Sequence, residues 1–129
     1  MLAFAGTQAQ NLYKNPARMT MSDRSNEADL FRQVIADLRS VAKSDKLLTG
    51  ENAEKLSRNL HLWDALSVDL LSQENALPDE IKNSLIDLGK FVRQHTLKLY
   101  AGEGSVDVLI DINVAILGGL DTRNAKEAS

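Results

Sequence analysis

Apolar residues recur every three or four positions along most of the chain, which is the spacing of one face of an α-helix. The first stripe lies between the start signals Ser22 and Asp23 and the stop signals Ser44 and Asp45. Its members are Leu30, Phe31, Val34, Ile35, Leu38, Val41 and Ala42. The sequence therefore predicts a first main helix across this region.

A second stripe opens near Thr49-Gly50, has Glu51 in its first turn and ends by Gln73. It comprises Ala53, Leu56, Asn59, Leu60, Trp63, Leu66, Ser67 and Leu70. The same spacing predicts a second helix, and this one carries the only tryptophan of the chain.

A third helix is predicted to start at Pro78, because proline suits the first helical position and the acidic Asp79 and Glu80 complement the positive end of a helix dipole. Its expected buried stripe is Ile81, Leu85, Leu88, Val92 and Leu99.

A fourth helix follows the glycines Gly102 and Gly104, with Ser105 as its N-cap. Its apolar positions are Val106, Leu109, Ile110, Ile116, Leu117 and Leu120, and Gly118-Gly119 indicates a C-terminal cap. Evidence for strands is almost absent. We therefore predict an all-α protein, a small bundle of about four main helices.

The two ends of the chain lack the regular apolar spacing of the rest. Residues 1–20 form either a flexible, mildly basic arm or a short extra N-terminal helix around Gln8 to Lys14 that docks Leu12 and Tyr13 on the bundle. Residues 21–120 form the helical domain, and residues 121–129 are predicted to be a disordered tail.

Composition narrows the functional class. With 129 residues, of which 43% are hydrophobic, the chain is expected to form one small soluble domain. The net charge of −3 disfavours direct binding to nucleic acid or to an anionic membrane. The absence of cysteine excludes disulfides and thiolate ligands and is compatible with the reducing cytoplasm. Neither a secretory signal nor a membrane-spanning segment is recognisable, so we expect a cytoplasmic protein.

The residues that carry chemistry are sparse. His61 and His95 are far apart, and neither stands in a metal-ligand pattern. No phosphate-binding or nucleophile motif is present. The sequence therefore predicts a protein that is not an enzyme and that has no cofactor and no metal.

Three polar or amphipathic residues interrupt the apolar faces. Asn59 and Asn113 each lie one turn from large apolar residues, so we expect both to be buried and hydrogen-bonded in a structural role. Trp63 is expected to be a core anchor, with a contact to a partner as the alternative.

The last helix is hydrophobic almost all round between Val106 and Leu120. Such a helix is either central in the bundle or covered by another protein, and both alternatives stay open, as does a homodimer that hides it. An exposed apolar groove would receive an amphipathic helix of a partner.

A composite set of residues resembles the FlaF family of flagellar biosynthesis regulators, over a region from about Tyr13 to Leu120. The residues that carry the resemblance are Asn59, Leu62-Trp63, Asp69, Leu77-Pro78, Phe91, Ile112-Asn113 and Gly119-Leu120, with Arg24, Glu27 and Ala28 near the start.

The resemblance implies a cytoplasmic chaperone that binds flagellin and promotes its synthesis and its secretion through the flagellar type III export system. The alternative is a post-transcriptional regulator of flagellin translation that acts through FlbT. Under the chaperone interpretation, a groove between the Trp63 helix and the last helix would hold the terminal helical segments of flagellin. Its predicted contact residues are Trp63, Leu66, Leu70 and Ile116.

Overall fold

The protein is an all-α bundle, as the sequence predicts. The computed structural model describes residues 21–46 and 49–128, and within these ranges it contains four helices and no strand. They are α2 (Met21–Ala42), α3 (Gly50–Leu71), α4 (Asp79–Tyr100) and α5 (Asp107–Ala128). The N-terminal arm of residues 1–20, with its alternative of a short helix, lies outside the described residues.

Local side chains start the helices where the sequence indicated. The Thr49 hydroxyl accepts a hydrogen bond from the Asn52 amide at 3.0 Å, which caps α3. The Ser105 hydroxyl accepts one from the Asp107 amide at 3.1 Å at the start of α5. Pro78 is the N-cap of α4 and not its first helical residue, so the helix begins one residue later than predicted.

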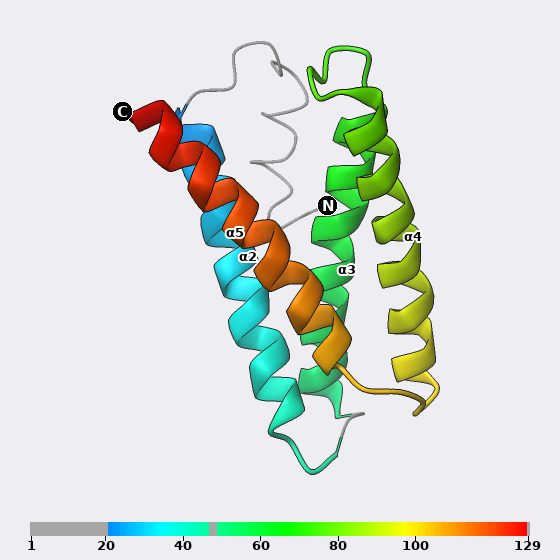
Figure 1. Ribbon diagram of the computed structural model, residues 1–129. Helices are drawn as coiled ribbons and strands as arrows, with labels where there is room; N and C mark the ends of the chain where they lie inside the picture. The colour runs from blue at the N-terminus through cyan, green and yellow to red at the C-terminus, as the bar shows by residue number, and fades with distance from the viewer. Residues whose placement is uncertain (1–20, 47–48, 129) are drawn as a thin grey trace.

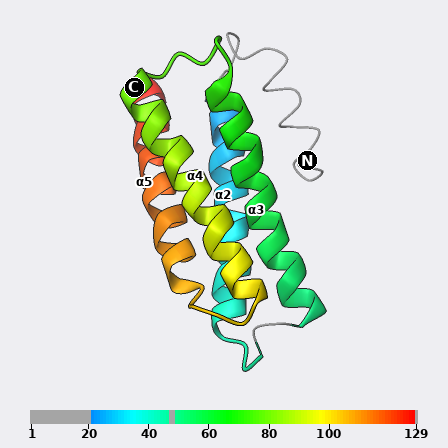
Figure 2. The ribbon, with the colours of Figure 1, turned by 90° about the vertical axis from the view of Figure 1, so that its right-hand side faces the viewer.

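Successive helices run in opposite directions, and each neighbouring pair shares a seam (Figure 1). The most extensive seam joins α2 to α5, and well-packed seams join α3 to α4 and α2 to α3. The α4 and α5 helices contact each other far less. Figure 1 shows why: α5 crosses in front of α2 and leans away from α4 as it proceeds. Figure 2, seen from the side of α4, shows α4 in front of α2. One of the four seams of the bundle is therefore loose.

The core is built from side chains of all four helices. Trp63 lies at its centre with 1% of its surface exposed, and Phe31 meets its ring edge to face at a centroid distance of 6.0 Å. The largest fully buried apolar side chains around them are Leu38, Leu56, Leu99, Leu109, Val41 and Val92. Each such side chain contributes about 1.5–3 kcal/mol by leaving water, so burial on this scale holds the bundle together.

The last helix extends further than the sequence predicts. It passes through Gly118 and Gly119 without a break and continues to Ala128. The glycine pair is therefore not a C-terminal cap, and the segment 121–128 is helical where a disordered tail was expected. Extending a formed helix costs far less than nucleating one, and the residues after Gly119 include no glycine or proline to stop it.

The predicted buried stripe of α4 is only partly buried. Val92 and Leu99 are fully covered, whereas Leu85 and Leu88 are half-buried and Ile81 is 46% exposed. Ile81 was thus wrongly assigned to the core. Its position on the helix face is the expected one, but α5 has already leaned away at this end of α4.

Candidate partner-binding surface

A buried relay of polar side chains joins α3 to α5. The Trp63 indole N–H donates to Asn113 Oδ1 at 2.8 Å, and Asn113 Nδ2 donates to Asn59 Oδ1 at 2.7 Å. Both asparagines are 0% exposed, in the positions that the apolar pattern indicated. Since a buried polar group without a partner is costly, this relay fixes how the two helices meet.

The four residues predicted to contact a partner do not share one surface. Trp63 and Leu70 are buried, at 1% and 2% exposure, and offer no surface in this structure. Leu66 and Ile116 are partly buried and pack against the core. Of the predicted set, Ile116 alone lies on α5 beside the loose seam.

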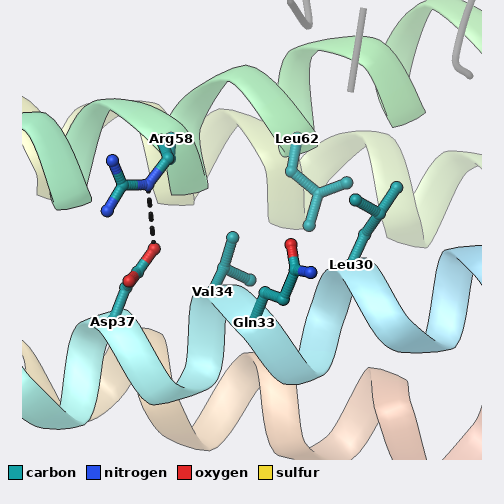
Figure 3. A pocket seen from close by; sticks show the side chains of 6 residues that line it. All are labelled: Leu30, Gln33, Val34, Asp37, Arg58 and Leu62. Atoms are coloured by element: carbon teal, nitrogen blue, oxygen red, sulfur yellow. Dashed lines mark hydrogen bonds and ion pairs between the residues drawn. The ribbon is translucent and has the colours of Figure 1, made fainter. Parts of the chain in front are cut away.

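A small cavity opens on the opposite side of the bundle, at the seam between α2 and α3 (Figure 3). Its volume is about 50 Å³, and at one end Arg58 Nε donates to Asp37 Oδ2 at 3.0 Å. This hydrogen bond raises the pKa of Arg58 above its ordinary value. Pockets for drug-sized ligands occupy roughly 300–1,000 Å³, so this cavity is far too small for one.

The connection between α3 and α4 is held by a short chain of hydrogen bonds. Asn75 Nδ2 donates to Asp69 Oδ2 at 2.9 Å, and the Leu77 amide donates to Asn75 Oδ1 at 3.0 Å. Asp69 is 7% exposed, and its Oδ1 has no hydrogen-bond partner. Burial raises the pKa of this carboxyl, while the bond from Asn75 and the charge of Lys82 oppose the rise.

Three contacts identify the sides of α4. Arg93 pairs with Asp64 of α3, and a Cβ built on Gly89 would lie 2.8 Å from Ser67 Oγ, so this flank faces α3. His95 Nε2 lies 2.6 Å from the Ser105 carbonyl oxygen just before α5, so His95 marks the other flank.

Large apolar side chains gather on the flank that faces α5. With 100° of turn per residue, Ile81, Leu88 and Phe91 lie on the same side as His95. Phe91 is 41% exposed and stacks on the His95 ring at a centroid distance of 5.6 Å. No binding role was predicted for Phe91 from the sequence, where its signals are its place just beside the buried stripe of α4 and its membership of the residues that carry the family resemblance.

The α5 helix completes this surface. Leu109 and Asn113 point into the core, and the right-handed turn then directs Ile112 and Ile116 toward α4. The opposite flank of α5 faces α2. Ile112 and Ile116 stay half-buried. We define the open edge as Ile81, Leu88 and Phe91 of α4 together with Ile112 and Ile116 of α5.

Burial between α4 and α5 is deepest at the loop end of the open edge. At the end where the loop 101–106 joins the two helices, Leu99, Val106 and Leu109 are at most 4% exposed. Farther from the loop, Leu88 is half-buried and Ile81 is 46% exposed. The surface is thus closed at the loop and widens toward the start of α4.

Residues 21–46 and 49–128 contain neither of two other kinds of site. Within them, no group of His, Asp or Glu side chains has the arrangement of a metal site. No described helix combines the length and the apolar character needed to cross a lipid bilayer.

Comparison with known families gives a match. The sequence model of the family described as flagellar protein FlaF matches residues 9–120, which is most of the chain. No curated protein and no solved structure matches the sequence.

Proposed function

Because the chain belongs to the family of flagellar protein FlaF, we propose that it is a non-enzymatic chaperone that binds flagellin in the cytoplasm. In this role it promotes flagellin synthesis and secretion through the flagellar type III export system. The observation that carries the proposal is the open edge, an apolar surface at the one loose seam of the bundle.

The physical argument concerns exposed apolar surface. Segments of flagellin that pack together in a filament must be kept apart before export, and an apolar stripe on a helix is the feature that drives such association. A helical bundle with an unfilled apolar seam can cover a stripe of this kind, as other grooves receive amphipathic helices.

The charge of the chain supports a protein partner over messenger RNA. Its net charge of −3 supplies no general attraction to phosphate. Regulation of flagellin translation, on this argument, proceeds through a protein such as FlbT and not through direct contact with the message.

The test is size-exclusion chromatography with light scattering on the purified full-length protein, alone and mixed with monomeric flagellin of the same organism. We expect a stable complex at micromolar concentrations. Flagellin that lacks its terminal helical segments should elute separately.

Separate elution of intact flagellin would contradict the proposal. A complex with FlbT in the same experiment, without one with flagellin, would assign the protein to the translational role. Retention of the truncated flagellin would show that binding uses another part of that protein.

A further inference from the structure

We propose that the open edge is the docking site for an amphipathic helix of flagellin, which adds a fifth helix along the seam between α4 and α5. The helix would carry an uncharged apolar stripe bordered by basic residues. This inference rests on the proposed function for the identity of the partner, and it adds the surface and the chemistry of the bound segment.

The first argument is the apolar character of the open edge. Ile81 and Phe91 are 46% and 41% exposed, and the other three side chains are half-buried. The residue between Ile81 and Leu88 on this flank is Ser84, so no charge interrupts the stripe. An uncharged stripe of large side chains matches the apolar face of a partner helix.

The second argument is shape. The ten residue steps from Ile81 to Phe91 correspond to about 15 Å, or roughly three turns of helix. A partner helix of this length presents anchors at positions i, i+3 or i+4, and i+7. Since the loop closes one end of the open edge, the partner enters from the end formed by the start of α4 and the later turns of α5.

The third argument is charge. Glu80 and Asp87 border the open edge on the outer side of α4, and Lys98, exposed on the same face, lies nearer the closed loop end. Lys82 lies on the opposite flank, where its charge acts on Asp69. Lys90 is 4.0 Å from Asp87, and both side chains are more than 70% exposed, so this weak pair leaves the carboxylate available.

The same charges decide between two occupants. In a symmetric dimer whose two-fold axis runs along the open edge, Glu80 and Asp87 would lie close to their own equivalents. Like charges in an interface are unfavourable, whereas lysine or arginine beside the stripe of a partner helix would complement them. The arrangement therefore favours a basic-flanked helix over a homodimer.

The decisive variant is Ile81→Glu/Phe91→Glu, which places two carboxylates on the open edge at exposed positions. Leu97→Glu is the matched control, because Leu97 is 54% exposed but lies on the flank of α4 that faces away from α5. Circular dichroism confirms the folding of both variants. Binding of monomeric flagellin, measured by calorimetry, should weaken at least about tenfold for the double variant and stay unchanged for L97E.

The outcomes separate the two proposals. If wild-type protein binds flagellin and the double variant binds it equally well, the open edge is wrong as the site and the chaperone function stands. If wild-type protein does not bind flagellin, both proposals fall. A wild-type dimer that the double variant converts into a monomer would overturn the proposed occupant in favour of self-association.

The charge argument has its own variant. Glu80→Gln/Asp87→Asn removes both bordering carboxylates with little change in volume, and Asp45→Asn/Glu103→Gln removes two exposed carboxylates elsewhere. The first pair should weaken flagellin binding several-fold and flatten its dependence on salt, while the second pair should not. An equal effect of both pairs would show that basic residues beside the apolar stripe of the partner helix do not contribute to binding.

Discussion

The polar relay shows how single residues specify this fold. Asn113 stands 50 positions from Trp63 and 54 from Asn59 along the chain, yet the three residues form one hydrogen-bonded line in the core. Apolar side chains can slide past one another with small losses, but a buried amide that loses its partner cannot. The relay therefore excludes neighbouring registers of α5 against α3.

We expect Asn113→Ala to lower the free energy of unfolding by about 2–4 kcal/mol, because it strands the Trp63 N–H and the Asn59 Oδ1 in the core. Urea unfolding followed by the fluorescence of Trp63, the only tryptophan, measures the change. Asn83→Ala at an exposed position of α4 is the control. A loss below about 1 kcal/mol would mean that the relay does not stabilise the core.

The sequence predicted part of this site and not the rest. Burial of Asn59 and Asn113 follows from their place between apolar residues on a helix face. The hydrogen bond between them does not follow, because apolar spacing shows which side of a helix is buried without showing which other helix packs against it. Trp63 became a predicted binding residue for the same reason, since its indole partner lies on a helix distant in sequence.

Asp69 should make stability depend on pH in a definite direction. Burial raises its pKa above the ordinary 3.8, so the folded protein binds this proton more tightly than the unfolded chain does. Stability from this group is therefore present at low pH and is lost as pH rises through the folded pKa.

The comparison of wild-type protein with Asp69→Asn isolates this effect. As pH falls from 7 toward 3.8, the stability of wild-type protein relative to the variant should rise. Urea midpoints across this range provide the measurement, with Asp87→Asn as the exposed-site comparison. A difference that stays constant with pH, or that changes in the opposite direction, would contradict the expectation.

At the scale of the elements, helix positions were predictable and helix packing was not. The first three helices and the start of the fourth lie where apolar spacing and caps indicated. Ile81 has the correct spacing for the core but is 46% exposed, because its burial depends on the angle at which α5 crosses the bundle. A crossing angle arises from contacts between helices that are distant in sequence, so the local sequence pattern does not determine it.

The glycines of α5 permit a direct test of its length. Each is helical, and a Cβ built on either meets no atom within 4 Å. Gly118→Ala/Gly119→Ala should therefore raise the free energy of unfolding, by about 0.5–1 kcal/mol for each substitution. Urea unfolding and helical circular dichroism report the change. A loss of stability would instead indicate a left-handed cap at this pair, which was the expectation from sequence.

For the whole molecule, the gradient of burial along the open edge should be a gradient of local stability. Amides near the loop, in residues 92–98 and 109–113, lie beside fully buried side chains such as Val92 and Leu109. Amides in residues 83–89 and 114–120 lie where burial is incomplete. Hydrogen exchange followed by mass spectrometry should show faster exchange in the second pair of segments. Uniform protection across both helices would contradict this expectation.

The conformation of the loop between α4 and α5 sets the direction in which α5 leaves α4. Gly102 and Gly104 have φ values of 81° and 84°, a region that glycine adopts without strain, and His95 contacts the carbonyl of Ser105 beside them. A helix of 22 residues is about 33 Å long, so a rotation of about 10° at its base displaces its tip by about 6 Å. The six loop residues therefore set the distance between α4 and α5 along the entire seam. A substitution at Gly102 or Gly104 would shift the far end of α5, at the opposite end of the molecule.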